Sequence, residues 1–139
     1  ERHPRSREIR CLKRGLLYIR YFYEQVFFSW LVGNNDMHLK NFSLYAPKGK
    51  WGLTPAYDLL NVNLVNPKDD EELALTLNAR KKRIKKADFV KAMETSGIAP
   101  KVFENMVSKY HKLLPSEYIQ ASLFVESVPI HMPFAQDNS

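Results

Sequence analysis

The sequence predicts a mainly α-helical domain with small β-hairpin elements. Apolar residues recur three and four positions apart over a long stretch that ends at Gly-Asn-Asn, residues 33–35, a typical helix stop. Two short apolar runs flank a Pro-Lys-Gly-Lys turn at 47–50, which predicts a β-hairpin. Helical spacing returns near residue 89 and is divided by Gly97 and Pro100, so further short helices are expected.

Composition limits the class of protein. A chain of 139 residues suits one domain with a real core, and 45% hydrophobic with 26% charged residues excludes wholesale disorder. The net charge of +6 fits either an anionic partner or a lysine-rich surface. The single cysteine, Cys11, excludes an internal disulfide and favours a reducing, cytoplasmic setting. The apolar stretch at 18–32 contains Arg20 and Glu24 and is too short to span a bilayer, so no membrane partner is expected.

The first half of the chain is expected to hold an arm, a helix and the hairpin. Residues 1–15 are basic and polar and are taken as an N-terminal arm. The hairpin should pair residues 42–45 with 51–53, and a loop follows at 54–58. The apolar face of the helix consists of Ile19, Phe22, Tyr23, Val26, Phe27, Trp30 and Leu31.

The second half begins with an acidic segment, and residues 73–77 then alternate weakly, as a strand would. The basic run 80–86 fits a solvated turn, or else a surface for an anionic partner. One helix should end at Gly97 and another should start at Pro100. The expected core stripe of that second helix is Val102, Phe103, Met106, Val107, Tyr110, Leu113 and Leu114. A further helix is expected from Pro115, before an extended or frayed tail at 128–139.

Three polar residues suggest phosphoryl transfer. Asp36 and Asn41 are five apart in the loop after the helix, and Asp58 follows the hairpin. Such a reaction needs one carboxylate to accept the hydroxyl proton, and a second carboxylate with an amide oxygen to hold Mg²⁺ on the ATP phosphates. The hairpin should bring both loops side by side, and Lys40 is placed to put positive charge on the transferred group. On spacing alone, these residues are more typical of turns.

His38 lies between the proposed base and the proposed magnesium ligand. As a metal ligand it would need partner ligands, and no second histidine is near it in sequence. Ordering of the loop through hydrogen bonds is the better explanation for this residue. We keep His38 with Asn41 and Asp58 as a candidate cofactor-binding residue.

Three runs resemble a known family. Residues 33–43, Gly-Asn-Asn-Asp-Met-His-Leu-Lys-Asn-Phe-Ser, closely resemble the catalytic loop of the HipA toxin-kinase family. Residues 53–58, Leu-Thr-Pro-Ala-Tyr-Asp, resemble its metal-binding segment, and residues 72–78 resemble a later element. The resemblance extends from about Tyr18 to Leu123. It implies the C-terminal lobe of a protein-kinase-like fold, which we assign to residues 16–127.

The resemblance also implies roles and partners. Asp36 would be the catalytic base, and Asn41 and Asp58 would hold Mg²⁺ for ATP. Family members phosphorylate proteins on serine or threonine, and aminoacyl-tRNA synthetases are known targets. They act as toxins restrained by a helix-turn-helix antitoxin, so contact with DNA would be indirect.

Other parts of a complete kinase do not match. A phosphate-covering glycine-rich loop and a nucleotide-gripping lysine are expected in an N-terminal lobe. The glycines here are scattered at 15, 33, 49, 52 and 97. The chain is therefore expected to be one lobe: a fragment, a split-gene subunit that needs a separate N-lobe, or a degenerate remnant. The alternative function is that of a non-catalytic protein-interaction module.

Overall fold

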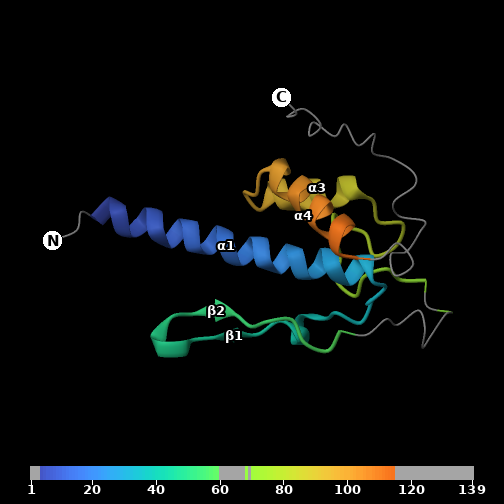
Figure 1. Cartoon of the computed structure of the whole chain (residues 1–139), viewed down its shortest axis with the longest axis horizontal. Helices are drawn as coiled ribbons and strands as arrows, with labels where there is room; N and C mark the ends of the chain where they lie inside the picture. The colour runs from blue at the N-terminus through green and yellow to red at the C-terminus, as the bar shows by residue number, and fades with distance from the viewer. Residues whose placement is uncertain (1–3, 60–67, 69, 115–139) are drawn as a thin grey trace, which may run out of the picture.

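The fold is built around one long helix. The computed structural model describes residues 4–59, 68 and 70–114. Helices α3 and α4 pack on one side of α1, and the β1–β2 hairpin runs along its other side (Figure 1). The mainly helical class with a small antiparallel sheet is thereby confirmed. The elements are α1 (Pro4–Leu31), η1 (Leu39–Asn41), β1 (Leu44–Tyr45), η2 (Pro47–Gly49), β2 (Gly52–Leu53), α3 (Lys86–Thr95) and α4 (Pro100–Leu113).

Helix α1 begins earlier than the sequence pattern predicts. Residues 4–15, taken from the sequence as part of a basic arm, form the first part of this 28-residue helix. Pro4 suits the first turn of a helix because its missing N–H would have no intrahelical partner there. Between Pro4 and Gly15 the chain contains mainly Arg, Lys, Leu, Ile and Glu, most of which are good helix formers. Basic composition therefore did not oppose helix formation. Among the described residues, no helix is long and apolar enough to cross a bilayer.

The end of α1 lies where the Gly-Asn-Asn sequence predicts it. Gly33 has φ +70, a left-handed conformation that glycine adopts without steric cost. The amide of Gly33 donates to the carbonyl of Trp30 at 3.4 Å, and the amide of Asn34 donates to the carbonyl of Ser29 at 2.8 Å. These bonds satisfy carbonyls that the last turn would otherwise leave unpaired. They also fix the direction in which the following loop leaves the helix.

The hydrophobic core lies between the C-terminal half of α1 and the α3–α4 pair. Phe27 is fully buried, and its ring lies 5.2 Å from that of Phe89 and 5.0 Å from that of Phe103, both edge-to-face. Edge-to-face pairs add about 0.5–1.5 kcal/mol each beyond the area that they bury. The predicted helix end at Gly97 and the helix start at Pro100 are both confirmed. The buried core cluster is Val26, Phe27, Trp30, Leu31, Leu73, Leu77, Ile84, Phe89, Met93, Ile98, Phe103 and Met106.

The hairpin is confirmed and is held against α1. Leu44 pairs with Leu53, and Tyr45 pairs with Gly52. The side-chain amide of Gln25 donates to the carbonyl of Thr54 at 3.3 Å, and the Tyr18 hydroxyl donates to the carbonyl of Trp51. Because Gln25 and Tyr18 lie on α1, the helix sets the position of the chain that leaves the hairpin.

The segment 73–77 is not a strand, contrary to the sequence prediction. Its only pairing within the described residues is one isolated bridge between Leu77 and Arg80. Leu73, Ala74 and Leu77 are all buried, so the burial of this segment does not alternate. The chain then turns sharply at 78–79, where both residues have positive φ. Packing of three apolar side chains against the helices overrides the weak alternation of the sequence.

One residue of the expected α4 core stripe is misplaced. Leu113 is 63% exposed, whereas Phe103 and Met106 are buried. Leu113 is the last residue of α4, where the helix passes beyond the core. The helix expected from Pro115 and the tail expected at 128–139 lie outside the described residues.

Candidate functional site

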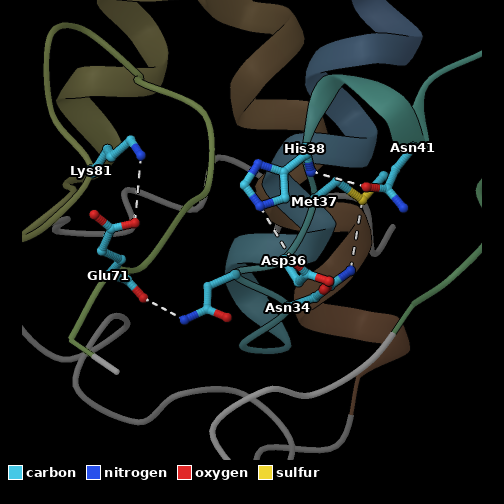
Figure 2. Close-up of polar contacts among 8 residues, drawn as sticks. Asn34, Asp36, Met37, His38, Asn41, Glu71 and Lys81 are labelled. Atoms are coloured by element: carbon cyan, nitrogen blue, oxygen red, sulfur yellow. Dashed lines mark hydrogen bonds and ion pairs between the residues drawn. The ribbon is translucent and has the colours of Figure 1, made fainter. Parts of the chain in front are cut away.

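The loop after α1 is fixed by a buried methionine. Met37 is 2% exposed, and its sulfur accepts the Ser29 hydroxyl at 3.1 Å. It also accepts the Asn34 side-chain amide at 3.7 Å, a contact drawn in Figure 2. Ser29 and Asn34 are themselves fully buried. The loop is therefore held to the core on both sides of Asp36, while Asp36 itself is exposed.

Asn34 carries an unsatisfied polar atom. Its amide oxygen is buried and has no hydrogen-bond partner within the described residues. A buried acceptor without a partner costs about 1–3 kcal/mol. Such costs call for a specific reason in a folded protein, and functional sites are one of the known reasons. The position of Asn34, two residues before Asp36, is consistent with a functional loop.

Asp36 and His38 form an exposed pair. The Asp36 carboxylate lies 3.2 Å from the imidazole Nε2 of His38, and both side chains are at least half exposed. An exposed ion pair of this kind contributes at most about 1 kcal/mol to stability. Its effect is to orient the carboxylate. Figure 2 shows the imidazole turned toward Asp36, an arrangement that suits ordering of the loop through hydrogen bonds.

Asn41 is the buried member of the predicted set. It is 6% exposed, and its amide oxygen accepts the backbone N–H of His38 at 3.0 Å. An amide oxygen has two lone pairs, so this bond leaves one free. Asn41 closes the η1 turn, in which its own N–H donates to the carbonyl of His38 at 2.9 Å. The turn thereby fixes where the Asn41 amide oxygen lies relative to Asp36.

Tyr57 ties the second predicted loop to the first. Its hydroxyl donates to the carbonyl of Lys40 at 2.9 Å and lies 2.8 Å from the Ser43 hydroxyl. The amide of Thr54 also donates to the carbonyl of Ser43, at 2.8 Å. Residues 54–57 therefore lie beside residues 40–43, as the hairpin predicted. The sequence motif assigned no role to Tyr57, and only its place next to Asp58 pointed to it.

Asp58 follows Tyr57 in a left-handed conformation, with φ +54. For a residue other than glycine this conformation costs about 1–2 kcal/mol, and such strain clusters at functional sites. Asp58 is exposed, and its carboxylate makes no hydrogen bond or ion pair within the described part of the chain. It is therefore free to meet a ligand.

The oxygens of Asn41 and Asp58 suit Mg²⁺. Mg²⁺ takes hard oxygen ligands and commonly uses one or two protein groups together with phosphates and water. The Asn41 amide oxygen, with one lone pair not used by His38, and the exposed Asp58 carboxylate are oxygen ligands of this kind. No group of three or more His, Cys, Asp or Glu side chains able to hold a metal occurs within the described residues.

The Glu72 carboxylate joins the 71–84 segment to α1, a role that the sequence did not reveal. Its carboxylate accepts the indole N–H of Trp30 at 3.0 Å and the backbone amides of Arg83 and Ile84 at 2.7 and 3.0 Å. The side-chain amide of Asn35 donates to the carbonyl of the neighbouring Glu71 at 2.8 Å (Figure 2). The 33–41 loop and the 71–84 segment are thus bonded to each other directly.

Three residues of the basic run 80–86 are paired with local acids. Lys81 pairs with Glu71 (Figure 2), and 3.5 Å separates the two charged groups. Lys82 lies 2.6 Å from Asp70. Arg80 lies 3.7 Å from Asp88 of α3. This arrangement favours the interpretation of the run as a solvated turn that leads into α3.

Comparisons with known proteins agree with this arrangement. A family model described as the HipA-like C-terminal domain matches residues 9–117. The chain is 54% identical over 41 residues to "Putative kinase Y4dM" of Sinorhizobium fredii, which is 29% of this chain and 10% of that protein. It is 40% identical over 45 residues to a "Putative kinase" of Haemophilus influenzae, which is 32% of this chain and 13% of that protein.

The family match and the matches to individual proteins cover different lengths of sequence. The aligned segments span only about a tenth of the length of each relative, so they concern a small part of those proteins. The family match covers well over half of the 139 residues. It includes the 33–43 loop, the hairpin, the 53–58 segment and both later helices. The chain belongs to the HipA-like C-terminal domain family.

Proposed function

We propose that the chain is the catalytic lobe of a protein kinase that transfers the γ-phosphate of ATP to a serine or threonine hydroxyl. The observation that carries the proposal is the Tyr57 hydroxyl, which holds the Asp58 segment beside Lys40 and Ser43. The loop that carries Asp36 and Asn41 and the segment that carries Asp58 are thereby held beside each other, which supports a shared site. The family membership and the kinase names of the relatives support the same reaction.

Asp36 acts as the general base in this proposal. Its exposed carboxylate, oriented by His38, accepts the proton of the attacking hydroxyl. The hydroxyl oxygen forms a new bond to the γ-phosphorus, the bond from that phosphorus to the β,γ-bridging oxygen breaks, and ADP leaves. Lys40, two residues after His38, places positive charge near the transferred group.

Asn41 and Asp58 hold the metal in this proposal. Mg²⁺, when bound, neutralises the charge that develops on the phosphates during transfer. The buried Asn41 amide supplies a rigid ligand, and Asp58 supplies the charged one. His38 positions Asp36 and is not required as a ligand.

The resemblance supports a wider role, as the toxin of a toxin–antitoxin pair. An aminoacyl-tRNA synthetase as substrate, a helix-turn-helix antitoxin as partner and a separate or covalently linked N-lobe are parts of this proposal. They rest on the resemblance of residues 33–43 and 53–58 to the toxin kinases.

Calorimetric titration with Mg²⁺-ATP tests the site. In the full-length protein, Asp58→Ala should weaken Mg²⁺-ATP binding at least tenfold, and Asp36→Asn should retain binding but lose phosphate transfer. Glu104→Gln, an exposed change on α4, is the control and should alter neither Mg²⁺-ATP binding nor phosphate transfer.

Unchanged Mg²⁺-ATP binding in Asp58→Ala would contradict the assignment of Asp58 as a metal ligand. Full phosphate transfer by Asp36→Asn would contradict the assignment of Asp36 as the base. Nucleotide binding with no transfer by the unmodified protein would favour the interaction module instead.

A further inference from the structure

A pocket of about 470 Å³ opens between α1, the η1 turn, the 73–78 segment and the end of α3. Its volume lies in the range of about 300–1,000 Å³ that is usual for ligand pockets. It has an apolar floor and a rim of neutral polar side chains. The lining residues are Phe22, Tyr23, Val26, Leu39, Leu73, Leu75, Thr76, Leu77, Asn78, Ala92, Thr95 and Ser96.

The lining selects against a charged ligand. None of the twelve lining residues is charged, although 26% of the whole chain is. An ionised group such as a phosphate would lose its hydration there without gaining an opposite charge, which is costly. The pocket is therefore distinct in chemistry from the carboxylate and amide groups proposed to hold Mg²⁺-ATP.

Four of the five polar side chains of the lining already make hydrogen bonds. The Tyr23 hydroxyl donates to the carbonyl of Ala92 at 3.0 Å and lies 2.8 Å from the Ser96 hydroxyl. The Thr95 hydroxyl donates to the carbonyl of Lys91 at 2.8 Å. The Asn78 side-chain amide donates to Asp88 at 2.8 Å. What the pocket offers a ligand is apolar contact, since these donors are used within the protein.

Leu39 connects the pocket to the proposed catalytic loop. It lies three residues after Asp36, and its side chain is 69% exposed at the pocket wall. Three residues of chain span at most about 11 Å, so Asp36 lies within that distance of Leu39 along the backbone. An extended peptide advances about 3.3 Å per residue. A peptide whose hydroxyl lies at Asp36 would therefore reach the pocket within about four residues.

We propose that this pocket receives an apolar side chain of the protein substrate, within about four residues of the phosphorylated serine or threonine. The inference rests on the proposed function and deepens it by naming a substrate feature. Leucine or phenylalanine matches the uncharged lining. A nucleotide does not, because its phosphates would meet no cation there.

Two exposed lining residues from different segments allow the pocket to be filled without disturbing the core. Thr95 ends α3, and Thr76 belongs to the 73–78 segment. Thr95→Trp and Thr76→Trp place a bulky ring in the pocket. Glu94→Trp is the matched control, because Glu94 is exposed on the same helix and does not line the pocket.

Binding is measured first, by fluorescence anisotropy without nucleotide. The probe is a fluorescein-labelled nine-residue peptide with a central serine and one leucine, compared with the same peptide carrying serine in place of the leucine. We expect the leucine peptide to bind at least tenfold more tightly, and both pocket-filling variants to abolish that preference. Glu94→Trp should keep the preference. Equal binding of the two peptides, or a preference that survives both filling variants, would overturn the proposal.

Phosphorylation by the full-length protein then separates this inference from the proposed function. The leucine is moved from four positions before to four positions after the serine, and kcat/KM is measured at each position. A maximum at one position on one side is expected. Transfer that ignores the leucine would overturn the docking site and leave the kinase proposal standing. Leucine-dependent binding without any phosphate transfer would leave the docking site standing and overturn the kinase proposal.

Discussion

The Tyr57 hydroxyl donates a hydrogen bond to the Lys40 carbonyl, 2.9 Å away, across a gap of 17 residues in sequence. The same hydroxyl meets the side chain of Ser43. These bonds join the two loops that carry the proposed base and the proposed metal ligands. They make Tyr57 a positioning residue, because it acts through the backbone on which Asn41 and Asp58 are placed.

Replacing Tyr57 by Phe removes only the hydroxyl. We expect the free energy of unfolding to fall by about 1–2 kcal/mol, since two hydrogen bonds of about 0.5–1.5 kcal/mol each are lost. Affinity for Mg²⁺-ATP should fall as well, because Asp58 is no longer held beside the first loop. Urea unfolding and calorimetry measure the two effects. Tyr45→Phe is the control, since Tyr45 is exposed on the hairpin. A Tyr57→Phe variant that behaves like Tyr45→Phe would contradict the role.

Glu72 predicts a larger effect on stability. Glu72→Ala leaves the indole N–H of Trp30 and two backbone amides without their acceptor. Hydrogen bonds to a charged group are worth about 1.5–3 kcal/mol each, so we expect a loss of at least about 2 kcal/mol. Urea unfolding followed by tryptophan fluorescence measures it. Glu104→Ala, in which only an exposed pair with Lys101 is lost, should change stability by less than about 0.5 kcal/mol. Similar losses of stability in Glu72→Ala and Glu104→Ala would contradict the stabilising role of the Glu72 hydrogen bonds.

Phe27 tests the position of the core. Phe27→Ala should lower the free energy of unfolding by about 3–5 kcal/mol, because it removes a fully buried ring that contacts the rings of Phe89 and Phe103. Leu113→Ala should cost less than about 0.5 kcal/mol, because Leu113 is 63% exposed. Thermal unfolding of both variants provides the comparison. A large loss in Leu113→Ala would instead restore Leu113 to the core stripe that the sequence predicted.

Tyr110 predicts a loss of stability at high pH. Burial, and then the nearby Glu24 carboxylate, raise the pKa of Tyr110 from 10.0 to about 12. Between these values the folded state holds a proton that the unfolded state has released, so stability falls as pH rises from about 10 to about 12. The stabilisation that comes from the raised pKa of Tyr110 is fully present below pH 10. Urea unfolding at a series of pH values should show a shallower decline in Tyr110→Phe than in the unmodified protein. Parallel declines would rule out Tyr110 as the source.

Periodicity and turn chemistry were sufficient for much of the local structure. The helical spacing up to Leu31, the stop at Gly33, the hairpin around residues 47–49 and the helix start at Pro100 all follow from the sequence. The physical reason is that these features depend on neighbours a few positions apart. The loop motifs at 33–43 and 53–58 likewise identified the family, which the match over residues 9–117 shows.

Features that depend on distant contacts required the tertiary structure. The alternation at 73–77 predicted a strand, but Leu73 and Leu77 are buried in the core of the helices instead. The roles of Tyr57 and Glu72 arise from partners 11 to 42 residues away in the chain. By itself the sequence determined which residues carry the proposed chemistry. Only the fold decided that a tyrosine hydroxyl joins the two loops and that a glutamate carboxylate ties the 71–84 segment to α1, because long-range hydrogen bonds leave no periodic pattern in the chain.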